Sequence, residues 1–159
     1  MIREIVIRET DGGDLWGSAA AGKCRTPEDA RAVVLAAIAN KPDFDGEKET
    51  FWVILLNTRN GVKAVNLVST GILDSCLVHP REVYRPAIVI GAAAIICVHT
   101  HPSGDPAPSV EDIRITRQLI QAGKVIGINC LDHVVLGRPN TERTRDFVSM
   151  REAGLVEFE

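Results

Sequence analysis

The stretch AAIICVHTHPSGDPAPSVED, residues 93–112, joins an apolar run to two histidines, a bend rich in proline and glycine, and an acidic pair. Its first nine residues predict a buried β-strand because they are mostly apolar and include β-branched side chains. Ser109, followed three residues later by Asp112, is the capping box that begins a helix. The stretch therefore predicts a strand, a bend and a helix in succession.

Strands and helices also alternate on both sides of this stretch. The patterns predict a helix at 27–39, a hairpin of strands at 51–57 and 62–68 joined at an Asn-Gly turn, a helix from His79 to about Gly91, and a strand at 128–137. The strand at 51–57 is apolar on both faces, which favours a central position in the sheet. The helix that begins after Ser109 is expected to reach Ala122, with Gly123 as its C-cap.

These elements predict an α/β fold, a mixed β-sheet flanked by helices on both faces. We expect one domain over residues 1–159, with a core at about 26–137. The first 24 residues form an extension, in which 2–9 resemble an edge strand and 11–22 a loop. A chain of 159 residues, 45% of them hydrophobic and 25% charged, suits a single globular core.

The composition also bears on compartment and partners. MIREIVIRET lacks the basic region and apolar run of a secretory signal, and no apolar stretch approaches the roughly 20 residues of a membrane span. The four cysteines form no C-x-x-C pair and suit a reduced compartment, so we expect a cytoplasmic protein without a membrane partner. The net charge of -3 and the absence of a Lys/Arg run disfavour a DNA-binding role.

The two histidines of the opening stretch suggest a metal site. Alternate side chains of a strand share a face, so His99 and His101 point the same way, about 6 to 7 Å apart along the strand. The bend is long enough for Asp112, in the first turn of the next helix, to approach the same point. Two imidazoles, one carboxylate and one open position are typical of a catalytic zinc site, so we expect one Zn²⁺ per chain.

Simpler interpretations exist for each of these residues. Asp112 taken alone is more readily a helix cap than a ligand, and an isolated H-x-H motif is often structural. Cys97 shares the strand face of the histidines, but its place within an apolar run favours a core role. His79 and His133 lack metal-ligand spacing to a second group and are expected to make structural hydrogen bonds.

The motif HTHPSGDPAPSVED resembles the metal motif of the JAB/MPN, or JAMM, metalloprotease superfamily, in which H-x-H is followed by seven residues, Ser, two residues and Asp. The chain is most similar to the bacterial RadC family, long labelled a DNA repair family. That likeness rests on HPREVYRPAIVIGAAAIICVHTHPSGDPAPS at 79–109 and LDHVVLG at 131–137. It covers about residues 26–137 and implies an α/β/α sandwich similar to that of cytidine deaminases.

The resemblance also implies roles for particular residues. The metal ligands would be His99, His101 and Asp112. Ser109 would lie beside the metal-bound water and stabilise an oxyanion. An upstream glutamate would shuttle the proton; it would be Glu49, with Glu47 as the competing choice on the same strand face.

The expected activity is hydrolysis of a peptide or isopeptide bond, with an unidentified peptide or protein as substrate. Full-length RadC proteins carry an upstream helical region related to helix-hairpin-helix modules, whereas this chain has a strand-like extension there, so direct DNA binding is disfavoured. A DNA-repair-associated accessory protein and a non-catalytic zinc or peptide-binding module are the alternatives. The oligomeric state is left open, although an exposed sheet edge is able to pair two chains as a homodimer.

Overall fold

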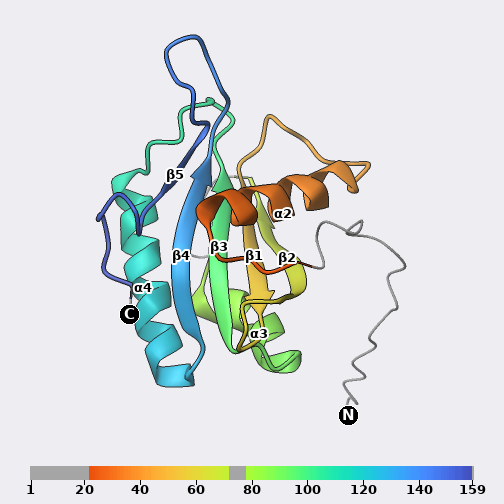
Figure 1. The fold of residues 1–159 in the computed structure, drawn as a ribbon, viewed down its shortest axis with the longest axis vertical. Coiled ribbons are helices and arrows are strands. Elements are labelled where there is room, and N and C mark those ends of the chain that lie inside the picture. Colours follow the sequence, from red (N-terminus) through yellow and green to blue (C-terminus); the bar gives the residue numbers. More distant parts are fainter. Residues whose placement is uncertain (1–21, 72–77, 159) are drawn as a thin grey trace.

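The computed structural model describes residues 22–71 and 78–158, which form a five-stranded sheet with helices on both faces (Figure 1). The strand expected at 2–9 and nearly all of the loop expected at 11–22 lie outside the described residues. The elements in chain order are α2 (Pro27–Ala39), β1 (Thr50–Leu56), β2 (Val62–Thr70), α3 (Pro80–Val89), β3 (Ala94–Thr100), α4 (Val110–Ile126), β4 (Asn129–Leu136) and β5 (Phe147–Ser149).

The sheet has the spatial order β2-β1-β3-β4-β5 and is mixed. Strand β1 pairs antiparallel with β2 and with β3, β3 pairs parallel with β4, and β4 pairs antiparallel with β5. Every residue of β1 is buried, so the central position predicted from its two apolar faces is confirmed. The β1–β2 hairpin is also confirmed, but its connection runs from Asn57 to Gly61 and is closed by the Asn60 amide, which donates to the Asn57 carbonyl, with Asn60 at a left-handed φ of 60°.

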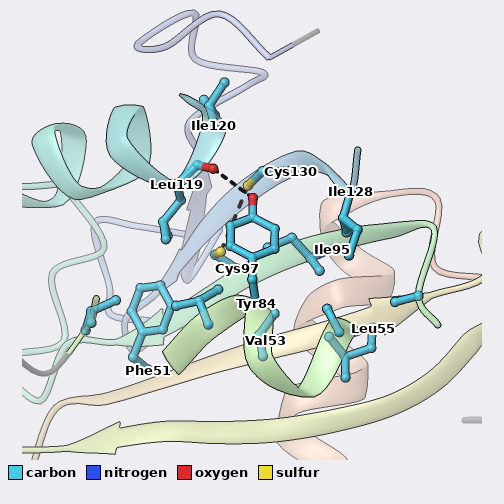
Figure 2. Packing of buried hydrophobic residues seen from close by; sticks show 14 of the residues in the cluster. Phe51, Val53, Leu55, Tyr84, Ile95, Cys97, Leu119, Ile120, Ile128 and Cys130 are labelled. Carbon is cyan, nitrogen blue, oxygen red and sulfur yellow. Dashed lines mark hydrogen bonds between the residues drawn. The ribbon is translucent and has the colours of Figure 1, made fainter. Parts of the chain in front are cut away.

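Two apolar layers lie on opposite faces of the sheet. Helix α2 packs on one face, where Val34 is fully buried beside Ile54 of β1. Helices α3 and α4 pack on the other face (Figure 2), where the Tyr84 hydroxyl donates a hydrogen bond of 2.8 Å to the carbonyl oxygen of Leu119. The α/β/α arrangement expected from the alternating elements is therefore confirmed.

Each helix begins at a residue that accepts a hydrogen bond from the first turn. Thr26 and Ser109 form capping boxes at α2 and α4, as the sequence predicts. His79 caps α3, where its Nδ1 atom accepts from the amide of Arg81, which confirms its structural role. Across the two described ranges, none of the helices combines the length and apolar character that a bilayer crossing requires.

Two predictions about the last third of the chain are wrong. Helix α4 continues through Gly123 to Ile126 and ends at Gly127, whose φ of 79° is left-handed. Gly123 instead allows a close approach, because a Cβ there would lie 2.4 Å from the Tyr84 hydroxyl oxygen. The segment expected to be only a tail contains a fifth strand, β5, which pairs with β4.

A register shift in β4 determines which of its residues face α4. Cys130 pairs with Ile95 and Asp132 with Ile96, so Leu131 is an extra residue with no partner in β3. Beyond this bulge, His133 pairs with Cys97 and lies on the same face of the sheet as Cys130. Strict alternation would have placed His133 on the opposite face.

Candidate metal centre

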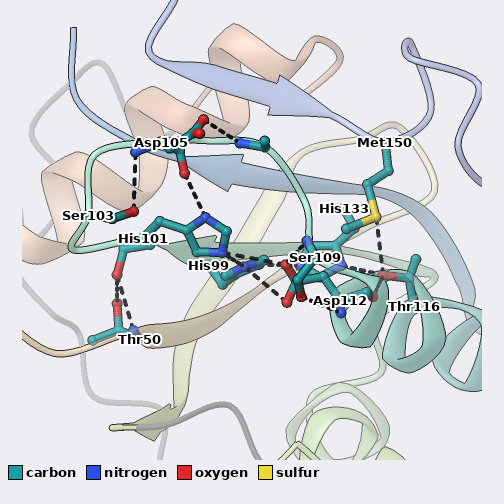
Figure 3. Close-up of polar contacts among 12 residues, drawn as sticks. Thr50, His99, His101, Ser103, Asp105, Ser109, Asp112, Thr116, His133 and Met150 are labelled. Atoms are coloured by element: carbon teal, nitrogen blue, oxygen red, sulfur yellow. Dashed lines mark hydrogen bonds and ion pairs between the residues drawn. The ribbon is translucent and has the colours of Figure 1, made fainter. Parts of the chain in front are cut away.

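The two histidines and the aspartate named from the sequence come together where β3 ends and α4 begins (Figure 3). His99 is buried within β3, His101 follows the strand, and Asp112 is in the first turn of α4. One potential ligand atom from each side chain lies within 4.8 Å of the other two. The bend between strand and helix therefore returns the chain to the strand end, as expected.

The ligand atoms face one another directly. Nε2 of His99 and Nε2 of His101 are 2.8 Å apart. The Asp112 carboxylate reaches both rings, with Oδ1 at 3.4 Å from His99 Nε2 and Oδ2 at 3.4 Å from His101 Nε2. Two nitrogens and one carboxylate oxygen are a donor set that suits zinc and other divalent transition metals.

Asp112 also caps its own helix. Its Oδ2 atom accepts a 2.6 Å hydrogen bond from the amide of Ser109, and Ser109 Oγ accepts one of 3.1 Å from the amide of Asp112. The cap predicted from the sequence is therefore confirmed, and it orients the same carboxylate toward the imidazoles. Because Ser109 Oγ acts as the acceptor in this cap, its hydroxyl proton is left for another acceptor.

His99 is held by side chains of the protein interior. Its ring is fully buried and stacks on Phe51 of β1, with ring centroids 6.1 Å apart and an angle of 12° between the planes. Its Nδ1 atom lies 2.8 Å from Nε2 of His133, whose Nδ1 atom lies 2.5 Å from Oγ1 of Thr116 in α4. The imidazole of His99 is thus held by Phe51 against its ring face and by His133 at its Nδ1 atom.

His101 is held by the backbone of a surface loop. Its Nδ1 atom donates a 2.7 Å hydrogen bond to the carbonyl oxygen of Asp105. The neighbouring carbonyl of Gly104 accepts from the amide of Arg138 at 2.8 Å and from Nη1 of Arg143 at 2.9 Å. Arg143 also forms an ion pair with Asp105, 3.2 Å between Nη2 and Oδ1. The segment after β4 therefore braces the loop that orients His101.

The electrostatics of the cluster keep the carboxylate charged. Burial alone raises the pKa of Asp112, but the contacts with His101 and His99 and the Ser109 amide bring it well below its usual range. Burial lowers the pKa of His99 and outweighs the opposing effect of Asp112. For His101 burial is again the largest single influence, yet the hydrogen bonds to Asp112 and to the Asp105 carbonyl together raise its pKa.

The two upstream glutamates differ in their surroundings. Glu49 directly precedes β1 and is partly buried, and its charge raises the pKa of both His99 and His101 against the larger effect of burial. Glu47 has a side chain that is 86% exposed, and its Oε1 atom lies 3.9 Å from Nη2 of Arg138. Of the two glutamates, Glu49 is therefore the one whose charge contributes to the pKa shifts of His99 and His101.

Two residues beside the site were not expected there. His133 was predicted to make structural hydrogen bonds, which it does, but its partner is the candidate ligand His99. Thr116, one turn beyond Asp112 on α4, was not singled out, although its i+4 spacing from Asp112 was the available signal. Cys97 is buried in the apolar cluster with its Sγ atom 4.0 Å from that of Cys130, as its core interpretation predicts.

The fold and the site together define an α/β protein with two histidines and an aspartate that could hold a metal ion at the end of a sheet strand. Residues 24–155 match the sequence profile of the RadC-like JAB domain, and the chain belongs to that family. The match includes β1 to β5, the candidate ligands and the loop that braces His101.

Curated relatives agree with this assignment. A UPF0758 protein of Desulforudis audaxviator is 47% identical over 131 residues, which cover 82% of this chain and 52% of the relative. A UPF0758 protein of Symbiobacterium thermophilum is 54% identical over 108 residues, 68% of this chain and 44% of the relative. The chain therefore spans about half the length of the curated relatives it matches.

Proposed function

We propose that this protein is a zinc-dependent hydrolase that cleaves a peptide or isopeptide bond. The observation that carries the proposal is the convergence of His99, His101 and Asp112 beside the charge of Glu49. Three protein ligands leave a fourth position open, and that is the pattern of catalytic rather than structural zinc sites. When bound, the zinc ion would supply a water molecule activated near neutral pH and would polarise the scissile carbonyl.

The protein groups have separate tasks in this proposal. The carboxylate of Glu49 accepts a proton from the attacking water and returns it to the leaving nitrogen. The hydroxyl of Ser109 donates to the developing oxyanion, since its oxygen already accepts from the Asp112 amide. Support for Glu49 over Glu47 comes from partial burial and from its effect on both histidines, whereas Glu47 is exposed.

The first experiment is a measurement of metal per chain. The protein is purified without chelators or a histidine tag and analysed by elemental mass spectrometry beside a His99→Ala/His101→Ala variant. We expect about one zinc per chain, lost in the variant, as for a site with three protein ligands. Wild-type protein that takes up no zinc, even when zinc is supplied, would contradict the proposal at its first step.

Turnover is tested next with Glu49→Gln and its matched control Glu47→Gln, against a panel of fluorogenic peptide and isopeptide substrates. Glu49→Gln should keep its zinc and lose on the order of a hundredfold or more in kcat, because the general base is gone. Glu47→Gln should stay within about twofold of wild type, since its carboxylate is solvated. Zinc binding without any turnover would contradict hydrolysis and leave a metal centre of another use.

A further inference from the structure

A chain of short contacts runs from the candidate ligand His99 to the backbone of α4 (Figure 3). His99 Nδ1 lies 2.8 Å from His133 Nε2, and His133 Nδ1 lies 2.5 Å from Thr116 Oγ1. Thr116 Oγ1 lies 2.6 Å from the carbonyl oxygen of Asp112. The side chains of His99, His133 and Thr116 are fully buried, so these contacts fix where their protons lie.

The last acceptor sets the direction of the whole chain. A carbonyl oxygen can only accept, so the hydroxyl proton of Thr116 belongs to the contact with Asp112. Thr116 Oγ1 must then accept from His133 Nδ1–H, which leaves Nε2 of a neutral His133 without a proton. That nitrogen in turn accepts from His99 Nδ1–H, so the free lone pair of His99 is on Nε2. Met150 Sδ, a weak acceptor 3.4 Å from the hydroxyl, does not alter this order.

The opposite order would disable His99 as a ligand. If Thr116 donated to His133, then His133 would donate to His99, and His99 Nε2 would carry a proton. A protonated imidazole nitrogen has no lone pair for a metal ion. That order would also place the Thr116 hydroxyl oxygen 2.6 Å from the Asp112 carbonyl with no proton between them.

His101 reaches the same state by a shorter route. Its Nδ1 atom must donate to the Asp105 carbonyl, so its lone pair is also on Nε2. The Nε2 atoms of neutral His99 and His101 therefore face each other at 2.8 Å with both lone pairs bare, beside the Asp112 carboxylate. Bare lone pairs and a negative charge repel one another unless a metal ion lies among them or a proton is bound at His101 Nε2.

We propose that His133 and Thr116 are positioning residues that hold His99 in its Nδ1–H tautomer and so present its Nε2 atom to a metal ion. The inference rests on the metal site of the proposed function and adds two residues outside the histidine motif. Metal-binding histidines usually donate their other ring N–H to a neighbouring group, and losing that partner typically lowers metal affinity 10- to 100-fold.

The bulge in β4 helps to place His133 beside His99. Asp132 holds the bulge, since its Oδ1 atom accepts from the amides of His133 and Arg151 and its Oδ2 atom accepts from the Ser149 hydroxyl at 2.6 Å. The extra residue Leu131 turns His133 toward α4 and His99. Asp132 and His133 therefore lie on opposite faces of the sheet, where Asp132 holds the bulge and His133 contacts His99.

The test compares Thr116→Val with Thr116→Ser. Valine keeps the shape of threonine but removes the hydroxyl, whereas serine keeps the hydroxyl. The dissociation constant for Zn²⁺ is measured by competition with a chromophoric chelator, and circular dichroism verifies that both variants fold. We expect Thr116→Val to bind zinc about 10- to 100-fold more weakly than wild type and Thr116→Ser to stay within about threefold.

The tautomer itself is read by long-range ¹H–¹⁵N NMR on chelator-treated protein, a signal that a merely structural role of Thr116 would not move. Wild type and Thr116→Ser should show the Nδ1–H form of His99, and Thr116→Val a mixture of both tautomers. Wild-type zinc affinity or an unchanged His99 tautomer in Thr116→Val would overturn the inference. Weakened zinc binding together with no turnover by wild type would contradict only the hydrolase and leave the positioning role standing.

Discussion

The two candidate histidine ligands are two residues apart, yet different parts of the molecule hold them. His99 is enclosed by the core, with Phe51 against its ring and the His133–Thr116 pair behind it. His101 is only partly buried, and a loop carbonyl braced from the segment after β4 orients it. One half of the site is therefore built into the apolar core, and the other half depends on a surface loop.

Truncating each histidine in the zinc-free protein should have unequal effects on stability. His99→Ala should lower the free energy of unfolding by roughly 3 kcal/mol, because it leaves a cavity beside Phe51 and removes the partner of buried His133. His101→Ala should cost about 1 kcal/mol or less, since its ring is only partly buried and its Nδ1 atom bonds a carbonyl of a surface loop. Urea denaturation of both variants measures the difference, and equal losses would show that the two halves are not distinct.

The pH dependence of stability should divide in the same way. Burial lowers the pKa of His99, and that of His133 even further, so both oppose folding once the pH falls below the unfolded value of about 6.5. The raised pKa of His101 has the opposite effect, since its proton stabilises the folded state below about pH 6.5 and that gain is lost as the pH rises through its folded pKa.

Replacing His101 should therefore make the chelator-treated protein more sensitive to acid. We expect His101→Gln to remove this gain, so that the free energy of unfolding falls more steeply as the pH is lowered from the folded pKa of His101 to about 6.5, by up to about 1.4 kcal/mol per pH unit, the value for one proton. The depressed pKa of Asp112 has no part in this window, because its contribution is lost only below about pH 4. Urea titrations at several pH values test the slope, and a shallower slope in His101→Gln would refute the division.

The smallest expected effect is on the loop itself. Arg143→Ala removes the contacts to Gly104 and Asp105 that brace the carbonyl facing His101, and should weaken zinc binding roughly threefold. Arg85→Ala, which removes an exposed ion pair with Glu82 within α3, is the matched control and should leave affinity unchanged. Chelator competition measures both, and an Arg143→Ala variant with wild-type affinity would show that the loop holds His101 without this clamp.

Much of the architecture follows from local patterns. The apolar run before His99 forms β3, the two apolar runs on either side of Asn60 and Gly61 form the β1–β2 hairpin, and the capping boxes begin α2 and α4 where predicted. These features depend on a few neighbouring residues, because periodicity and capping are properties of the local backbone. The bend after His101 was likewise enough to predict that Asp112 returns to the strand end.

Other features depend on contacts between distant segments. Gly123 looks like a helix end in the sequence, but Tyr84 of α3 occupies the space above it and the helix continues to Ile126. The tail gains a strand only because β4 offers an open edge to Phe147–Ser149. Neither the close approach nor the strand pairing has a signal in the local sequence. Local propensity therefore predicted the end of α4 and the structure of the tail wrongly.

The site divides along the same line. His99, His101 and Asp112 are recognisable from their spacing along the chain, since strand alternation and one capped helix are sufficient to bring them together. His133 reaches His99 only through the bulge at Leu131, and a bulge arises from hydrogen bonding between neighbouring strands. The local sequence therefore identifies the atoms that could bind a metal ion, and tertiary packing decides which of the imidazole nitrogens carry protons.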